Sequence, residues 1–378
     1  MTRRLTSLLT TVAPVAAKAA AWRPPVWLAP NALGTGPAEM EILIADTTGR
    51  VIGEIQPQVQ GVAWKLNNYG QVRLTVSRAE FVERPWLFRF GNRILFRFGN
   101  GLAEWGGVID PPRKWNSERV SVVGYSGEYL LDWRVTDRGR YFNKATAGDI
   151  FRAVIREARD FDVALGYVWT GGAPHSPEYH FESIYDIVTR SITRRLEAVD
   201  WDVRPVLEDG RIRFVANLYE RRGSDYSVGS ALGRRIGFVE GINVTGSMDE
   251  QGPIVNDIYL AGSGSGWGEG SRIYSHVWDE NSRALYDLRQ GGETVVDISV
   301  QGTLDGAAAL RLAEQSAPKE VYSLTAYDTA PARFAQYGVG DTVWLEMFSV
   351  GAAGREQGVR VVAQEYLPAS NTCSLVVE

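Results

Sequence analysis

The sequence predicts a mainly β protein that carries a small α+β insertion. Three observations lead to this fold class. Glycine is abundant, with 40 residues in 378, and aromatic residues make up 11% of the chain, a composition that favours strands joined by many turns. Short runs of alternating apolar and polar residues dominate both ends of the chain. Between them lies a stretch in which the apolar residues recur at helical spacing instead.

Composition narrows the possible functions. Hydrophobic residues make up 44% and charged residues 22%, as in ordinary globular proteins, and the length favours two or three domains. The net charge of −5 argues against a dedicated nucleic-acid binder, which would be basic. Cys373 is the single cysteine, so neither an internal disulfide nor a cysteine-based zinc site is expected. No apolar run is long enough for a membrane span.

The first 38 residues form an N-terminal extension. Arg3, Arg4 and the apolar run from Leu5 imitate a secretory signal, but threonines, a serine and Pro14 interrupt that run. We therefore favour a segment that packs on a neighbouring subunit, followed by a stiff connector that contains four prolines, and we keep a targeting peptide as the alternative. Trp22 and Trp27 are its candidate interface residues.

A first β domain is predicted over residues 39–140. "EILIADTTGRVIGEI" is typical of two strands with a turn at 47–50, and "WKLNNYGQVRLTVSR" repeats this scheme around 67–70. Val72, Leu74 and Val76 alternate with polar residues, which is the period of a half-buried strand.

The hexapeptide LFRFGN occurs twice within this domain, at 87–92 and 95–100. We interpret the two copies as neighbouring strands of a meander, with turns at their Gly-Asn pairs. The arginines Arg89, Arg93 and Arg97 would then lie opposite the phenylalanines. A solvated face or an interface with another subunit is favoured for them over a phosphate-binding comb.

An inserted α+β domain is predicted over residues 141–225. "TAGDIFRAVIREAR" places apolar residues on one stripe of a helix, with Thr146 as N-cap and Asp149 three positions later. "SIYDIVTRSITRRLEAV" repeats the pattern after Ser183. Asp209-Gly210 between two alternating runs is a strong hairpin signal.

The remaining residues, 226–378, return to β structure with one helix. Two strands are expected in "GINVTGSMDEQGPIVNDIYLAGSG", and "GSGSGWGEG" is expected to be a loop. "TLDGAAALRLAEQSAP" is a helix that begins at a Thr303 cap and ends before Pro318. "VYSLTAYD", "DTVWLEM", "GVRVVAQEYL" and "TCSLVVE" are four further strands.

No motif rises to a catalytic, cofactor or metal site. His175 and His180 lack the spacing of a helical zinc pair, and "GSGSGWGEG" has neither the lysine of a phosphate-binding loop nor a following helix. "GYSGE" (124–128) departs from the nucleophile elbow, and nothing marks Glu104 and Asp110 as an acid–base pair. The tryptophans near strand patterns are expected to pack in cores or interfaces. We therefore expect a protein that is not an enzyme and holds no cofactor.

The order of these elements resembles the tail hub proteins of long-tailed phages. Just before the insertion, the run "LAEWGGVIDPPRKWNSERVSVVGYSGEYLLDWRV" matches the loose pattern of that family at Gly107, Ile109, Val120, Val122, Gly124, Ser126, Leu130, Leu131 and Arg134. The helix from 303 and "YGVGDTVWLEM", with Tyr337, Gly338, Gly340, Asp341 and Val343, is similar to the family's ending. The resemblance covers residues 40–378.

The resemblance implies a structural role at the tip of a tail in a phage or a related particle such as a gene transfer agent. Two tail-tube-like β-barrel domains, 39–140 and 226–378, would flank the insertion. Three chains would form a ring that continues the six-fold tail tube. Implied partners are a distal tail protein ring, the tail tube or tape-measure protein, tip or fibre proteins, and DNA that passes through the lumen without specific binding. An acidic chain suits such a duct.

Two other function classes stay open at this point. A carbohydrate-binding adsorption module would be a monomer with ring-stacking tryptophans at its surface. A cell-wall hydrolase would need a pair of carboxylates at catalytic separation in a cleft.

Overall fold

The structure is a computed structural model that describes residues 39–136, 139–157, 163–227, 236–264, 272–295, 298–350 and 354–378. The N-terminal extension with Trp22 and Trp27, the end of the first predicted helix and most of the glycine-rich loop lie outside these residues. The described residues all belong to one compact unit, Leu33–Glu378.

Strands from both ends of the chain form one large sheet, with 14 strands among the described residues. Its first half contains β1 (Met40–Ala45), β2 (Val51–Glu54), β3 (Gln58–Lys65), β4 (Gln71–Ser77), β5 (Arg93–Phe98), β6 (Trp105–Ile109), β7 (Lys114–Trp115) and β8 (Arg119–Ser126). Its second half contains β14 (Gly237–Val239), β15 (Val244–Gln251), β19 (Lys319–Tyr327), β20 (Thr342–Met347), β21 (Arg355–Leu367) and β22 (Thr372–Val377). The mainly β fold predicted from the sequence is confirmed.

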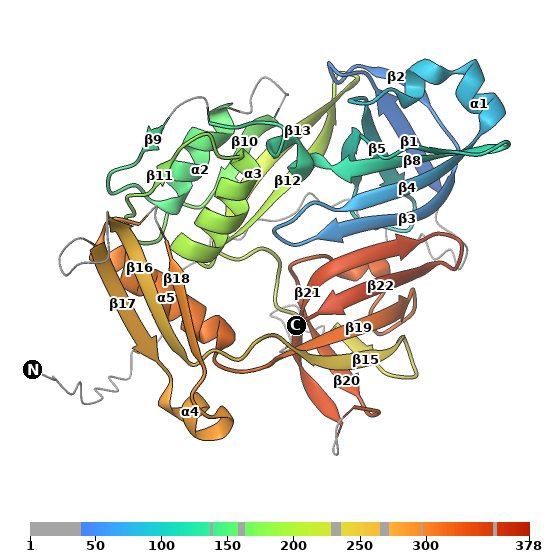
Figure 1. The fold of residues 1–378 in the computed structure, drawn as a ribbon. Helices are drawn as coiled ribbons and strands as arrows, with labels where there is room; N and C mark the ends of the chain where they lie inside the picture. The colour runs from blue at the N-terminus through green and yellow to red at the C-terminus, as the bar shows by residue number, and fades with distance from the viewer. Residues whose placement is uncertain are drawn as a thin grey trace, which may run out of the picture. The chain divides into compact units, whose positions relative to one another are not determined.

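The two halves of this sheet repeat one strand order, although β14 pairs with β20 in parallel and its counterpart β1 pairs with β5 antiparallel. In the first half the order is β3-β4-β8-β6-β5-β1, and in the second it is β15-β19-β22-β21-β20-β14. Each strand of the second half therefore has a counterpart in the first. The halves are joined where β21 pairs antiparallel with β3, which Figure 1 shows side by side.

The chain between β8 and β14 forms the predicted α+β insertion. Its sheet has the order β10-β13-β12, from β10 (Val163–Val168), β12 (Asp200–Glu208) and β13 (Arg211–Tyr219). Two short strands, β9 (Arg140–Tyr141) and β11 (Glu178–Tyr179), pair separately. The predicted Asp209-Gly210 hairpin is confirmed, and both residues have the positive φ of a type I′ turn, 49° and 69°.

Helices cover this smaller sheet. The helix α2 (Ala147–Ile155) begins with the predicted capping box, in which the Thr146 hydroxyl accepts from the backbone of Asp149. The second predicted helix is also present: α3 (Ile184–Asp186) starts at the Ser183 cap and continues as η4 (Ile187–Leu196), a π-helix. Their apolar stripes, including Ile150, Phe151 and Ile187, are buried.

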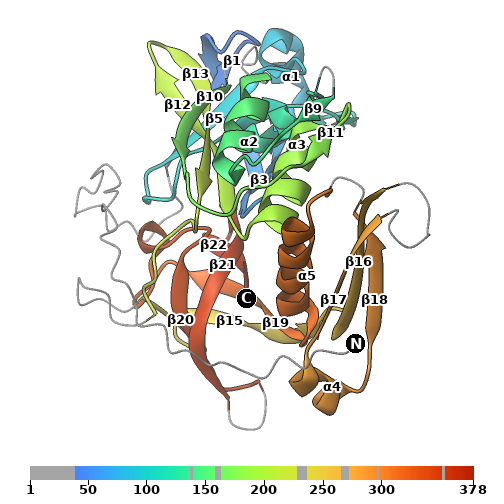
Figure 2. The same cartoon turned by 90° about the vertical axis from the view of Figure 1, so that its left-hand side faces the viewer.

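A second insertion interrupts the hairpin between β15 and β19. A three-stranded sheet of order β17-β16-β18 is built from β16 (Asp257–Gly264), β17 (Arg272–Trp278) and β18 (Gln290–Thr294). The helix α5 (Gln301–Gln315) lies along one face of it (Figure 2), and Ile258, Leu260 and Leu304 form a core between them.

Two local predictions for these regions are wrong. The first LFRFGN copy is not a strand: Pro85 opens the turn η1 (Pro85–Phe88), and the Asn92 side chain then donates to the carbonyls of Trp86 and Leu87. The second copy is β5 as predicted, because no proline precedes it. Helix α5 begins at Gln301, so Thr303 lies inside it and is not its cap.

Two short helices were not expected. The first, α1 (Arg78–Glu83), follows β4 and is capped by Ser77. The second, α4 (Glu280–Tyr286), gives the C-terminal part of the chain two helices where one was predicted. The Asp279 carboxylate caps α4 by accepting from the backbone of Asn281 and Ser282, an Asp cap that the sequence pattern does allow. Two further 3₁₀ turns are η2 (Gly127–Leu131) and η5 (Phe334–Gln336).

Candidate assembly surfaces and the joint that supports them

The joint between β21 and β3 is the place where the two halves of the large sheet meet. Val62, Ala63 and Trp64 of β3 lie opposite Tyr366, Glu365 and Gln364 of β21. Arg73 of β4 reaches across to form an ion pair with Glu365. Gly61 allows this close approach, since a Cβ there would lie 2.4 Å from the Glu365 carboxylate.

Aromatic rings also pack at this joint. Phe98 lies 5.6 Å from Trp64 and 5.9 Å from Tyr366 between ring centroids. The indole of Trp105 is fully buried and donates to the Ala63 carbonyl at 2.8 Å. The joint thus combines backbone pairing with a packed core, as an interior sheet contact does.

Several strand edges stay open among the described residues, and two of them, those of β15 and β7, hold matching places in the two halves of the large sheet. β15 ends the sheet on one side and pairs only with β19. Its side chains Ser247, Asp249 and Glu250 are exposed, and Met248 is half-buried. The short strand β7 pairs only with β8, and both of its residues, Lys114 and Trp115, are exposed. Charged residues on an open edge keep it from pairing indiscriminately.

A buried polar cluster links both halves of the sheet to the α+β insertion. The Asp200 carboxylate accepts from the Asn67 amide at 2.9 Å, from the Arg222 backbone at 2.7 Å and from the Arg360 guanidinium. Asn67 lies in the β3–β4 turn and Arg360 in β21. Asp200 is 4% exposed, so its charge is compensated inside the protein and not by solvent.

Asp202 extends this cluster within the insertion. Its carboxylate pairs with Arg204 at 2.8 Å and with Arg222 at 3.2 Å, and it accepts from the Asn217 amide. Burial alone would raise the pKa of Asp202, but the two guanidinium groups hold it below its usual value. The acid therefore stays ionised as a fixed partner for both arginines.

Glu128 is the one strongly perturbed acid beside this cluster. It is fully enclosed, and burial raises its pKa to about 7 even though Ser126 and the Val203 backbone donate to its carboxylate. A perturbed acid in a cleft would suggest catalysis. Glu128 does not line either of the two small pockets beside α5. Its contacts therefore give it a structural role between β8 and β12.

The arginines predicted for an interface lie in three different environments. Arg89 is exposed after η1. Arg93 is 3% exposed and donates to the carbonyls of Ile212 at 2.8 Å and Thr47 at 3.0 Å, so it holds β5 against the insertion within the chain. Arg97 pairs with Glu41 and Glu104 at the surface. Arg93 is therefore not on a solvated face with the other two. Arg89 and Arg97 are at the surface, and their part in an interface stays a prediction.

Several contacts of this site could not be predicted from the sequence. Asp200 and Arg360 meet only because β12 and β21 are brought together by the fold. The polar run Ser247–Glu250 was a signal that β15 is an edge strand, since buried strands seldom carry polar residues on both faces. The sequence analysis predicts a strand here but not its position at an edge.

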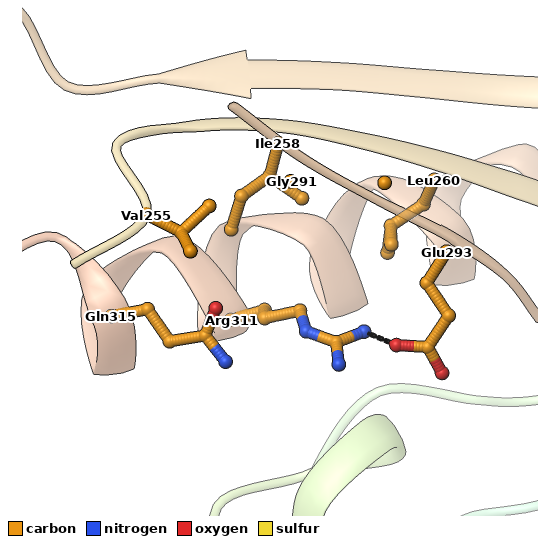
Figure 3. A pocket seen from close by; sticks show the side chains of 8 residues that line it. Val255, Ile258, Leu260, Gly291, Glu293, Arg311 and Gln315 are labelled. Carbon is orange, nitrogen blue, oxygen red and sulfur yellow. Dashed lines mark ion pairs between the residues drawn. The ribbon is translucent and has the colours of Figure 1, made fainter. Parts of the chain in front are cut away.

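Two small pockets lie along α5. One is lined by Val255, Ile258, Leu260, Gly291 and Gln315, with the Arg311–Glu293 ion pair at its side (Figure 3), and its volume is about 120 Å³. The other shares Arg311 and reaches Arg190 of η4, with a volume of about 250 Å³. Both are smaller than the roughly 300–1,000 Å³ of typical ligand sites.

The described part of the chain has neither a metal-binding cluster nor a membrane-spanning helix. There, no group of three or more His, Cys, Asp or Glu residues is placed to hold a metal ion. His175 instead lies 3.1 Å from Glu197, and His180 lies beside Glu178. Within the same residues, no helix combines the length and apolarity that a membrane crossing needs.

Comparison with known proteins gives matches in structure. Neither a protein-family model nor a curated protein matches this sequence. Among solved structures, the 43 kDa tail protein of prophage MuSo2 from Shewanella oneidensis matches with a TM-score of 0.57 at 12% identity, covering 89% of this chain and 97% of that one. A prophage tail protein of Listeria monocytogenes matches with a TM-score of 0.56 at 11% identity, covering 89% and 94%.

A third match points the same way. The tail protein of Neisseria meningitidis has a TM-score of 0.56 at 11% identity, covering 89% of this chain and 96% of that one. Nearly the whole of each of these three chains is covered. The chain therefore has the fold of phage tail proteins, as its sequence resemblance predicted.

Proposed function

We propose that this chain is the structural hub of a phage-like tail tip. Three copies would form a ring in which each contributes two tube-like units, residues 39–140 and 226–378, the second interrupted by the β16–α5 insertion. Residues 141–225 would lie outside the ring wall. The ring would adapt a six-fold tail tube to a three-fold tip and form the duct through which DNA leaves. No chemical step is needed for this role.

The repeated strand order is the observation that carries the proposal. Because β21 of the second half already pairs with β3 of the first, the same contact can be repeated between copies. In the strand order β21 corresponds to β6, but β21 is longer, and its end that pairs with β3 corresponds to β7, which pairs with β8 as that end pairs with β22. The counterpart of β3 is β15. A ring closed in this way covers the open edges of β15 and β7.

The register of the contact between copies follows from the buried residues. Val72 and Leu74 of β4 correspond to Tyr322 and Leu324 of β19, which are buried in the same alternation. Carrying the β21–β3 register across this correspondence places Met248 opposite Trp115 of the next copy, and Asp249 opposite Lys114. The contact then pairs an apolar side chain with an exposed ring and an acid with a base.

Disulfide trapping tests this register directly. Directly opposed strand residues have Cα atoms about 4.5–5.5 Å apart, within the range a disulfide spans. The variant Lys114→Cys with Asp249→Cys should therefore form covalently linked trimers under mild oxidation, resolved by denaturing gel and native mass spectrometry. Each single variant is the matched control. The natural Cys373 is buried, and burial raises the pKa of its thiol to about 12, so it does not compete.

Two outcomes oppose the proposal. A chain that stays monomeric up to high concentration and gives no trapped trimer argues against the ring. Trapping that stops at dimers argues against three-fold closure. We also propose that a distal tail protein ring, the tape-measure protein and fibre proteins contact the assembled hub in the virion. Co-purification of the trimer with tails, absent for the monomer, is the corresponding test.

A further inference from the structure

The outer face of the β17-β16-β18 sheet carries a row of exposed rings. Tyr274, His276 and Trp278 alternate along β17, and Tyr259 of β16 lies directly opposite His276. Tyr259, Tyr274 and Trp278 are each nearly half exposed, at 46–47%. The other face of this sheet packs on α5, so these rings are not part of the core of the insertion (Figure 2).

These rings are held in place by specific contacts. His276 stacks on Tyr259 with centroids 4.0 Å apart and planes 9° apart, and Trp278 lies 4.9 Å from His276. The Nε2 atom of His276 donates to the buried Asp257 carboxylate at 2.8 Å, since a carboxylate can only accept. Arg283 pairs with Asp257 and lies over the Trp278 ring. The surface is therefore ordered before any ligand arrives.

One face of Tyr259 is open. His276 occupies the face toward β17, whereas β18 on the other side places Gly292 next to Tyr259. A Cβ atom added at Gly292 would have only the Tyr259 carbonyl oxygen within 4 Å, at 3.8 Å. The exposed side chains of Gln290 and Thr294 flank this gap along β18. A flat ligand can lie here against an aromatic face with amide and hydroxyl groups beside it.

The charges beside the rings are already compensated. Asp257 is shared by His276 and Arg283, and Glu280 accepts from the Trp278 indole at 2.8 Å. A charged ligand would therefore gain little here. The combination of a free aromatic face with uncharged hydrogen-bonding groups is suited to a ligand that has flat apolar patches ringed by hydroxyl groups.

We propose that this face binds a neutral oligosaccharide, with one sugar ring on the Tyr259 face above Gly292. A protein partner is less well matched, because protein hot spots lie in pockets surrounded by residues that exclude water. Here the neighbour on the open side is a glycine. The inference uses only this insertion and does not depend on whether the large sheet forms a ring.

Binding of the full chain to immobilised cellotetraose, chitotetraose and maltotetraose tests the proposal. The wild-type protein should bind at least one of them. Gly292→Leu fills the gap over Tyr259, and Trp278→Ala removes the end of the row; each should weaken binding about tenfold or more. Gly292 has room for a side chain and lies in the ordinary strand conformation, so this variant should fold normally. Tyr141→Ala, an exposed ring on β9, is the matched control and should bind as wild type.

Three results would overturn the proposal. The first is a wild-type chain that binds none of the three glycans. The second is a Gly292→Leu protein that binds as well as wild type. The third is a change of oligomeric state in Gly292→Leu or Trp278→Ala, measured by light scattering, because the face would then be an interface between copies. Circular dichroism of each variant confirms that the fold is retained.

Discussion

Strands β3 and β15 hold the same place in the two halves of the large sheet but have different surfaces. β3 presents Val62, Ala63 and Trp64 to β21, and Val62 is fully buried. The corresponding residues of β15 are Met248, Asp249 and Glu250, and both acids are exposed. The apolar strand β3 is covered by β21 within the chain, and the charged edge of β15 has no partner strand among the described residues. The difference indicates that a free edge must stay soluble before assembly, whereas a covered edge can be optimised for packing.

We expect the largest loss of stability from a change in the buried polar cluster around Asp200, which lies beside the joint. Arg360→Ala removes the cation that β21 supplies to Asp200 and leaves a buried carboxylate with fewer partners. Loss of one member of a buried pair costs about 3 kcal/mol or more. We expect the free energy of unfolding in urea to fall by that amount.

A second arginine of β21 provides the control for the loss of any arginine from this strand. Arg355 of β21 pairs with Glu320 where both side chains are partly exposed. Arg355→Ala should lower the free energy of unfolding much less than Arg360→Ala, because solvent screens the attraction in an exposed ion pair. Equal losses for the two variants would show that the buried cluster does not stabilise the joint.

Glu128, which lies between β8 and β12, makes the free energy of unfolding pH-dependent. Burial raises the folded-state pKa of this acid from 4.5 to about 7, so the folded protein binds a proton that the unfolded chain releases. Its contribution is therefore most favourable below about pH 4.5 and is lost as the pH rises to about 7. Between pH 5.5 and pH 8 the loss should be about 2 kcal/mol in urea unfolding.

Glu128→Gln isolates this effect from other titrating groups. The amide keeps an oxygen for the Val203 backbone and carries no charge. The difference between pH 5.5 and pH 8 should shrink by most of the predicted amount. An unchanged pH dependence in the variant would contradict a neutral Glu128 in the folded protein.

Much of the fold could be predicted because its signals are local. Val72, Leu74 and Val76 alternate as a half-buried strand must, and Asp209-Gly210 specifies its own turn. The first LFRFGN copy shows the limit, since identical residues form a 3₁₀ turn once Pro85 precedes them. Contacts between residues far apart in the sequence could not be predicted. Neither the Asp200–Arg360 pair nor the stacking of Tyr259 on His276 has a sequence signature. Packing of the α+β insertion against β21 brings the first pair together, and pairing of β16 with β17 brings the second together.

Giving β15 the residues of β3 should make the open edge as apolar as the covered edge without unfolding the protein. The variant Asp249→Ala with Glu250→Trp gives β15 the residues of β3 at those positions. Exposed positions tolerate such changes within about 0.5 kcal/mol, so the free energy of unfolding should barely move. Solubility should fall, seen as concentration-dependent light scattering. Met248 and Trp115 are the other opposed pair of the proposed register. In a trimer trapped through Met248→Cys and Trp115→Cys, the same two changes lie on a covered edge and should scatter less.

The ion pair between Arg73 and Glu365 is expected to contribute least to the joint. Its side chains are 49% and 31% exposed, so solvent screens the attraction, although the pair crosses from β4 to β21. A double-mutant cycle with Arg73→Ala and Glu365→Ala should give a coupling of about 0.5 kcal/mol. Arg97 and Glu104, a comparably exposed pair within the first half, provide the matched cycle. A coupling several times larger for Arg73–Glu365 would mean that this ion pair, and not the packing of Trp64, Phe98 and Tyr366, is what holds the two halves together.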